Sequence, residues 1–294
     1  MMNLAVERIR QAAPEGRVLC AVSGGVDSTV CARLASLAVG DRLMCVFVDT
    51  GLFRQGEPES VISTFMDSMG LVVAQVDASE AFLRALSGVR SRDDKERIAA
   101  QLMTQVLIKQ LGYDPGIRAI VMGANLNDTL FGFSTSAEME SMKGAYNLCV
   151  CEPLRDLFKE EVRRLATALS LPDSIALRQP FPASGLALRI FGQVTPERLA
   201  VLRAADACFT EEIREAGYAK RLWQYYTNLV DSPDQPGTYA ISLRALQVSQ
   251  GGATAARLAF DVLERASERI RSEVKGVARV VYDLTPSNHY GEME

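Results

Sequence analysis

Histidine is almost absent from this sequence of 294 residues, which contains only His289, close to the C-terminal end. A single histidine leaves little room for a Ser-His-Asp triad, a Cys-His glutaminase centre or a metal cage built from several imidazoles. His289 itself is predicted to be a solvated tail residue rather than a general base, because terminal segments are often loosely held. Any catalysis is therefore expected to use other groups.

Cysteine spacing typical of metal or redox sites is also lacking. The six cysteines have no C-x-x-C spacing and lie mostly in apolar patterns, which argues against a disulfide framework or a structural zinc site. No run of about 18 apolar residues occurs, and the first residues lack an apolar signal-peptide core, so no membrane segment is expected and a cytoplasmic location is predicted. With a net charge of -4 and scattered basic residues, the chain is not expected to bind nucleic acid.

The most informative segment present is Ser23-Gly24-Gly25-Val26-Asp27-Ser28, which stands between an apolar strand pattern, 17–22, and a predicted helix, 28–39. Two glycines let the backbone approach an anion, Ser23 and Ser28 supply hydroxyl donors, and the helix N-terminus directs N–H groups to the same point. The sequence has neither G-x-x-x-x-G-K-[ST] nor G-x-G-x-x-G. The loop is therefore predicted to bind pyrophosphate, and the alternative is an ordinary Gly-Gly turn.

The first half of the chain alternates short apolar runs with helical patterns. This spacing predicts parallel strands joined by right-handed helical crossovers, hence an α/β domain with a doubly wound parallel sheet over residues 1–177. Ligands of such sheets bind beyond the carboxyl ends of the strands. Three segments follow directly on predicted strands and are expected to line one crevice: 23–28, 49–51 and 123–128.

The second half, residues 178–294, has fewer strands and a Pro-rich entry, RQPFPASG. Helices are predicted over 196–216, 219–228 and 254–274, and strands at TYAISLRAL and ARVVYDLT. Segregated helices and few strands are typical of a smaller α+β domain.

Two further segments carry candidate site residues. VFVDTGLFRQGE contains a predicted buried strand, and a nucleotide at the loop would lay its adenine across the strand edge near Val48, where backbone groups can read it. EPLRDLFKEEVRRLA places Lys159 in the first turn of a helix, where it is either a functional cation or part of a solvated face.

Taken together, SGGVDS, VDTGLFR, EPLRDLFKEEVR, RQPFP with GLALR, SLRAL and SERIRSEVKGVARVVYDLT resemble the ATP pyrophosphatase half of GMP synthetase, in the PP-loop ATP pyrophosphatase superfamily, in order and over nearly the whole chain. The resemblance implies that ATP binds at the loop, that an oxygen of xanthosine monophosphate (XMP) is adenylated with release of pyrophosphate, and that ammonia then displaces AMP. It also implies that the second domain is a dimerisation domain, so that the protein is a homodimer.

By the same resemblance, individual positions take on roles. Asp27 and Lys159 would be catalytic, and Asp27 with Asp128 would hold Mg²⁺. The pyrophosphate of ATP would be bound by the loop itself: Ser23, Gly24, Gly25, Val26, Asp27 and Ser28. Since both domains of the resemblance use all 294 residues, ammonia is expected from solution or from a separate glutaminase subunit.

Three departures from the family pattern concern the acceptor. SMKGAYNLCVC replaces a paired-histidine segment, PASGL replaces a PGPGL run, and the tail PSNHYGEME keeps Glu292 and Glu294 but loses a lysine. In the family these segments shape the nucleotide acceptor site, where Arg189 would also contribute.

Two alternative functions stay open. One is a paralogue that adenylates another acceptor or delivers sulfur, suggested by Cys149 and Cys151 on one strand face, although both are also well explained as small core residues. The other is a catalytically silent ATP-binding dimer.

Overall fold

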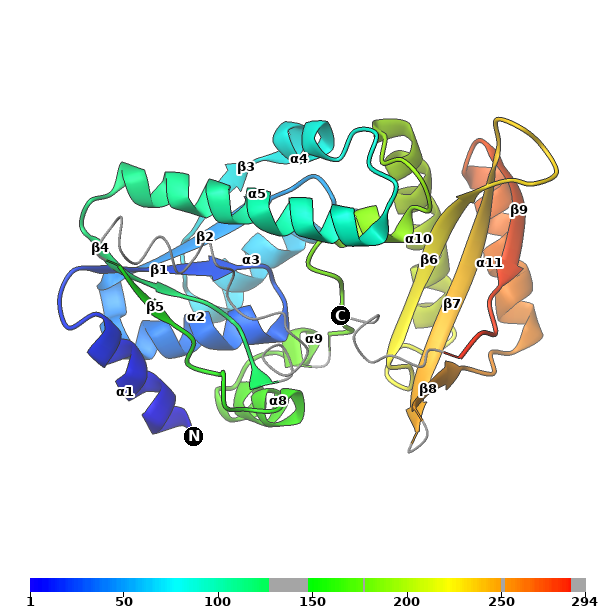
Figure 1. Cartoon of the computed structure of the whole chain (residues 1–294). Helices are drawn as coiled ribbons and strands as arrows, with labels where there is room; N and C mark the ends of the chain where they lie inside the picture. Colours follow the sequence, from blue (N-terminus) through cyan, green and yellow to red (C-terminus); the bar gives the residue numbers. More distant parts are fainter. Residues whose placement is uncertain (127–147, 177, 250–251, 287–294) are drawn as a thin grey trace. The chain divides into compact units, whose positions relative to one another are not determined.

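The computed structural model describes residues 1–126, 148–176, 178–249 and 252–286 (Figure 1). The chain divides into two compact units. Unit 1 contains residues 1–49, 58–78 and 101–178, and unit 2 contains residues 50–57, 79–100 and 179–294. The last division in the sequence falls after Arg178, and two short stretches of the first half, 50–57 and 79–100, pack with the second.

Unit 1 is built on a five-stranded parallel sheet with strand order β3-β2-β1-β4-β5. Its strands are β1 (Arg17–Val22), β2 (Leu43–Asp49), β3 (Val73–Asp77), β4 (Ile117–Val121) and β5 (Cys149–Cys151). The central strands read as nearly continuous apolar runs because helices cover both faces of a parallel sheet. The predicted doubly wound α/β fold is thereby confirmed, and β1 lies where the strand order reverses.

The helices of unit 1 precede, connect and follow these strands. They are α1 (Met2–Ala12), α2 (Val26–Val39), α3 (Glu57–Met69), α8 (Lys159–Ala168) and α9 (Asp173–Ala176), with the later part of α5 (Arg92–Tyr113) and the short turn Gly40–Arg42. Figure 1 shows α2 and α5 on opposite faces of the sheet. Helix α2 is buried on most of its circumference, which fits its run of small and apolar residues.

Unit 2 holds a four-stranded sheet in which β7 (Tyr239–Ser249) is central. Strand β6 (Gln224–Asp231) runs antiparallel along one side of β7. The other side is shared, because β8 (Gly252–Ala255) pairs antiparallel with the end of β7 and β9 (Val277–Tyr282) pairs parallel with its start. Helix α10 (Pro196–Glu215) packs on β6 and on α11 (Phe260–Glu273). Helix α4 (Ser79–Ala85) and the turn Gly185–Arg189 complete the unit.

Two helix predictions in unit 2 are wrong. The segment 219–228 is predicted as a helix, but β6 begins at Gln224, because the β-forming residues Tyr225, Tyr226 and Thr227 are buried against neighbouring elements on both faces. The helix predicted over 254–274 begins only at Phe260, and the residues before it include β8. In both cases pairing with β7 decides the local structure.

Segment 50–57 is joined to the rest of unit 2 by specific contacts. The Leu186 N–H donates to the Leu52 carbonyl at 2.8 Å, and the Arg203 guanidinium donates to the carbonyls of Gly51 and Phe53 at 2.6 and 2.9 Å. Gly185 has φ +60°, and a Cβ there would lie against the Leu52 backbone. Glycine is needed at this position, since the PASGL segment must approach another backbone closely.

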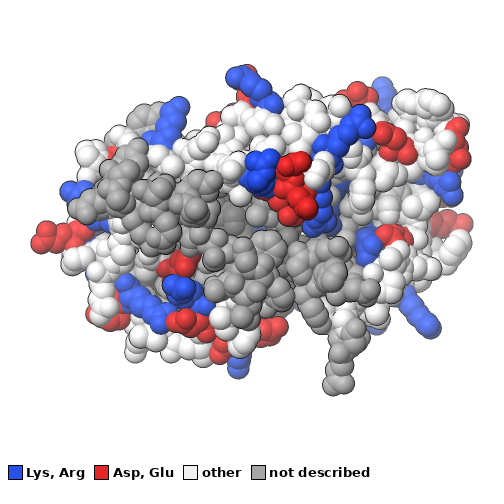
Figure 2. Space-filling view, viewed as in Figure 1, with Lys and Arg blue, Asp and Glu red and all other residues white. Residues whose placement is uncertain are grey.

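The described part of the chain has no helix long and apolar enough to span a membrane. On the face drawn in Figure 2, basic and acidic side chains are interspersed over the described residues.

Candidate nucleotide-binding site

The loop between β1 and α2 forms at the carboxyl edge of the sheet in unit 1. Gly25 is the N-cap of α2, with extended backbone, and Gly24 before it has φ +75°. A Cβ at Gly24 would overlap the side chains of Val61 and Arg178, so this position requires glycine for both conformation and space. The loop is thus a crowded turn that leads directly into a helix N-terminus.

The two loop serines face each other across this turn. The Ser23 and Ser28 hydroxyls are 3.1 Å apart, and the Ser28 hydroxyl accepts from the Ser23 N–H and donates to the Gly25 carbonyl, each at 3.1 Å. Gly123, just after β4, packs so closely that a Cβ there would lie 2.9 Å from the Ser28 nitrogen. Two of the three segments expected to line one crevice, 23–28 and 123–128, thus approach each other closely at Gly123 within unit 1.

Asp27 and Lys159 meet at the loop, although 132 positions separate them in sequence. The Lys159 ammonium donates to Oδ2 of Asp27 at 2.5 Å, and both side chains are mostly buried. Oδ1 of Asp27 is buried and has no hydrogen-bond partner among the described residues. A buried carboxylate oxygen in this condition is costly unless a ligand or cation satisfies it.

Helix α8 is positioned by the loop that precedes it. Phe158 is its N-cap, and the Glu161 carboxylate accepts from the Phe158 N–H at 2.9 Å, which fixes the first turn and so the direction of Lys159. In the same preceding loop, Asp156 pairs with Arg8 of α1 at 2.6 Å.

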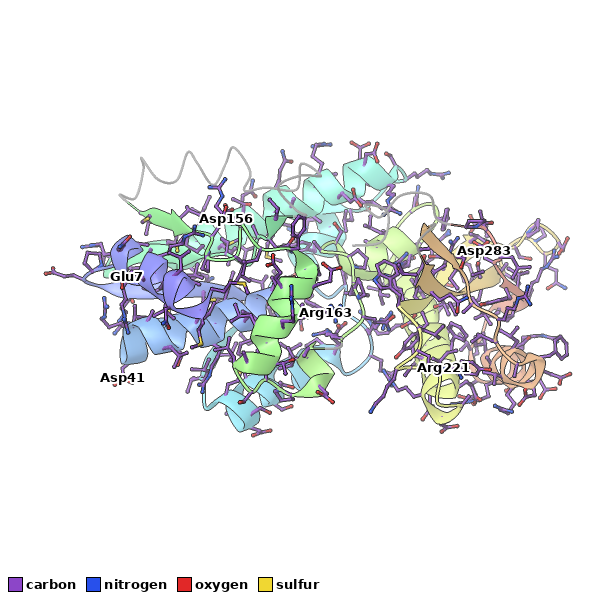
Figure 3. The ribbon with its side chains drawn as sticks, turned by 90° about the horizontal axis from the view of Figure 1, so that it is seen from below. Glu7, Asp41, Asp156, Arg163, Arg221 and Asp283 are labelled. Atoms are coloured by element: carbon purple, nitrogen blue, oxygen red, sulfur yellow. The ribbon has the colours of Figure 1, made fainter. Side chains whose placement is uncertain are left out.

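Two arginines near the loop were not found from the sequence. Arg178 donates through one guanidinium nitrogen to the Gly24 carbonyl. Arg163, labelled on α8 in Figure 3, donates to the carbonyls of Ala176 and Arg178 at 2.5 and 3.2 Å. Arginines that bind backbone carbonyls leave no spacing or composition signal, and the segments EPLRDLFKEEVR and RQPFP, which contain Arg163 and Arg178, were noted for the family resemblance and not for these arginines.

The other predicted site residues lie in several places. Val48 is buried on β2 just beyond Phe47, the last residue of that strand aligned with β1, and therefore lies beside the end of β1 where the loop begins. Arg189 is buried in unit 2, with its guanidinium 3.4 Å from the ring centroid of Tyr226, and burial lowers its pKa to about 10. Asp128, His289, Glu292 and Glu294 lie outside the described residues.

The cysteines singled out in the sequence differ in environment. Cys149 is exposed and Cys151 is buried at the two ends of β5. Burial, together with the nearby Cys149, raises the pKa of the Cys151 thiol to about 12, so that Cys151 is a neutral thiol at pH 7.

Comparison with known proteins identifies the family. Residues 2–189 match the NAD synthase family, and residues 211–289 match the family described as GMP synthase C terminal domain. The chain is 41% identical over 291 residues to one subunit of the "GMP synthase [glutamine-hydrolyzing]" of Methanocaldococcus jannaschii, covering 96% of this chain and 94% of that one. The chain belongs to the GMP synthase family.

Other relatives in this family are longer. "GMP synthase [glutamine-hydrolyzing]" of Geobacillus kaustophilus is 41% identical over 298 residues, and the chain spans 58% of that relative's length. Among solved structures, the NMN synthetase from Francisella tularensis has a TM-score of 0.49 and 19% identity, covering 63% of this chain and 75% of its own. The assignment to the family therefore rests on sequence identity to the relatives.

Proposed function

We propose that this chain is an ATP-dependent, AMP-forming carbon–nitrogen ligase that converts XMP to GMP. The observation that supports this most directly is the Asp27–Lys159 pair at a helix-capping Gly-Gly loop, in a chain that is 41% identical to a GMP synthase subunit over nearly its full length. The β- and γ-phosphates of ATP, which leave together as pyrophosphate, would lie at the loop, where the first N–H groups of α2 and the Ser23 and Ser28 hydroxyls are directed.

The proposed reaction has two steps. In the first, an oxygen of the acceptor forms a bond to the α-phosphorus of ATP while the bond from that phosphorus to the β-bridging oxygen breaks, so that pyrophosphate leaves. In the second, ammonia adds to the carbon that bears the adenylated oxygen and AMP leaves. Lys159 would stabilise the negative charge that develops on the departing pyrophosphate, and Asp27 holds its ammonium in place. No histidine is needed for either step.

The residues at the loop also fit a divalent cation. Oδ1 of Asp27 is a buried carboxylate oxygen with no partner among the described residues, and oxygen is the ligand that Mg²⁺ prefers. Asp27 would hold the ion, with Asp128 as a second ligand by family resemblance. When bound, Mg²⁺ would neutralise charge on the phosphates.

Ammonia and the oligomeric state form part of the same proposal. Because the Methanocaldococcus jannaschii relative is itself one subunit of its enzyme and is matched over 94% of its length, we propose that a separate glutamine-hydrolysing subunit supplies ammonia. We also propose a homodimer formed through unit 2, whose edge strand β9 pairs with β7 on one side.

The acceptor site departs from the family pattern. XMP is the default acceptor of the family, but the tail lacks the family's lysine, and acidic residues such as Glu292 and Glu294 cannot replace a cation on a phosphate. We therefore expect weak affinity for XMP, with another acceptor or sulfur delivery as the alternative.

ATP–pyrophosphate exchange and AMP release test this function. The wild-type chain with ATP, Mg²⁺, ammonium and XMP is expected to form AMP and GMP in equal amounts, with half-saturation in XMP above the low micromolar range. Asp27→Asn and Ser28→Ala are expected to lower the rate at least about tenfold, since each removes a contact to a charged ligand. Asp41→Asn, at an exposed position on the turn Gly40–Arg42, is the matched control and should keep the wild-type rate.

Two results would count against the proposal. Unchanged AMP formation in both Asp27→Asn and Ser28→Ala would show that the loop is not part of the active site. ATP binding without AMP formation for any of a panel of acceptors would favour the silent ATP-binding alternative. XMP saturation at low micromolar concentration would instead contradict only the expectation of a diverged acceptor site.

A further inference from the structure

One face of helix α8 is connected to both ends of the phosphate-binding loop. Lys159 and Arg163 are four residues apart and so lie one above the other on the helix. Lys159 binds the Asp27 carboxylate at 2.5 Å. Arg163 binds the carbonyls of Ala176 and Arg178, and Arg178 in turn donates to the Gly24 carbonyl. The first connection is a side-chain ion pair, and the second is a chain of guanidinium–carbonyl contacts.

The contact to Gly24 fixes the direction of a particular N–H group. The Gly24 carbonyl and the Gly25 N–H belong to one planar trans peptide and point in opposite directions. With its carbonyl held by Arg178, this peptide directs the Gly25 N–H towards the Ser23 hydroxyl, at a long donor–acceptor distance of 3.4 Å. The Gly25 N–H is therefore presented on the inner side of the loop, at the N-cap of α2.

A peptide flanked by two glycines needs such a constraint. Rotation of this peptide changes ψ of Gly24 and φ of Gly25, and neither residue has a Cβ that would restrict it. The 3.4 Å contact to Ser23 is too long to hold the peptide by itself. A guanidinium contact from outside the loop supplies the missing restraint.

We propose that Arg163 and Arg178 form a positioning pair that fixes the Gly24–Gly25 peptide so that its N–H faces the pyrophosphate of the bound nucleotide. This inference rests on the proposed function, because it assigns the loop a pyrophosphate ligand. Arg178 acts on the peptide through the Gly24 carbonyl, and Arg163 acts through Arg178. Neither residue belongs to the SGGVDS motif.

The test uses inorganic pyrophosphate with Mg²⁺ as the probe, titrated into the full chain, together with steady-state ATP–pyrophosphate exchange. Arg178→Ala and Arg163→Ala are each expected to raise the dissociation constant for pyrophosphate and the KM for ATP about tenfold, with kcat within about threefold of wild type, because Lys159 remains in place. Arg164→Ala is the matched control, since Arg164 is the exposed neighbour on the same helix. It should change neither value.

Combining the two substitutions tests the link between the arginines. If both act through the Gly24 carbonyl, Arg163→Ala/Arg178→Ala should bind pyrophosphate about as weakly as Arg178→Ala alone. Added guanidinium ion should restore binding to Arg178→Ala, and Arg178→Lys, which keeps one donor, should give an intermediate constant even if the alanine variant folds poorly.

Three results would overturn the pair. Unchanged binding in Arg163→Ala would mean that Arg178 acts alone. Fully additive effects in the double variant would mean that the two residues act independently. Wild-type affinity in Arg178→Lys and Arg178→Ala, while the wild-type protein binds pyrophosphate, would remove Arg178 from the site and leave the proposed function intact. A wild-type protein that binds neither ATP nor pyrophosphate would instead overturn the proposed function and this inference together.

Discussion

The two oxygens of the Asp27 carboxylate have different surroundings, and this asymmetry organises the site. Oδ2 receives the Lys159 ammonium at 2.5 Å, whereas Oδ1 is buried with no partner among the described residues. Because the ammonium of Lys159 is held by this carboxylate, it stays directed towards the loop. Asp27 can therefore coordinate a cation through Oδ1 while Oδ2 keeps Lys159 in position.

At the scale of single residues, the cysteines provide a test that distinguishes ammonia transfer from sulfur delivery. Cys149 is exposed, while the other five cysteines are buried. We expect iodoacetamide at pH 8 to modify one thiol per native chain, identified as Cys149 by peptide mass spectrometry, because burial keeps thiols such as Cys151 neutral and inaccessible.

The functional consequence follows from a substitution at the same residue. Cys149→Ser should abolish this labelling and leave AMP formation with XMP and ammonium unchanged. Loss of AMP formation in Cys149→Ser, with normal folding by circular dichroism, would support sulfur chemistry at this strand and contradict the proposed ligase reaction.

At the scale of elements, unit 2 depends on a segment from early in the chain. Arg54 of segment 50–57 pairs with Asp206 of α10 at 3.1 Å, and Asp206 also accepts from the Thr227 N–H of β6 at 3.0 Å. Asp206 is 2% exposed. One carboxylate thus joins a loop, a helix and a strand that are far apart in sequence.

Removal of this carboxylate should be costly. We expect Asp206→Ala to lower the free energy of unfolding by about 3–5 kcal/mol, because it leaves the largely buried Arg54 charge and the Thr227 N–H without their partner. Urea denaturation followed by tryptophan fluorescence would measure the loss. Asp234→Ala, which removes an exposed ion pair with Arg279, is the control and should cost less than about 1 kcal/mol. Equal losses in the two variants would contradict the structural role of Asp206.

Local signals account for what the sequence predicts well. The Gly-Gly turn, the helix after it and the parallel strands follow from residue types and periodicity, and so does the placement of Lys159 at a helix start. The Arg178 contact to Gly24, the packing of segment 50–57 in unit 2 and the strand β6 depend on partners more than a hundred positions away or on a neighbouring strand. No local pattern in the sequence encodes those partners.

At the scale of the whole molecule, the proposed homodimer predicts the molecular mass in solution. Strand β9 has β7 on one side, and among the described strands none pairs with its other side; Val281 on this strand is partly exposed. Light scattering at micromolar concentration should give about twice the chain mass of 32.1 kDa. Val281→Lys should shift the population towards monomer, since a charge on an edge strand opposes pairing.

The matched control for the dimer is Val72→Lys, at an exposed position in unit 1, which should leave the mass unchanged. A wild-type mass near that of one chain would contradict both the dimer and the use of unit 2 as its interface.

The interleaving of the two units in sequence has a consequence for how the protein is made. The chain passes from one unit to the other after residues 49, 57, 78, 100 and 178. During synthesis, segments 50–57 and 79–100 emerge before the sheet and helices that bury them. Their apolar side chains therefore stay exposed until most of the chain has been made. Such long sequence separations slow folding and expose intermediates to aggregation. A gene divided at Arg178 would therefore encode two fragments, of which the second lacks part of its core and the first carries apolar segments with nothing to cover them.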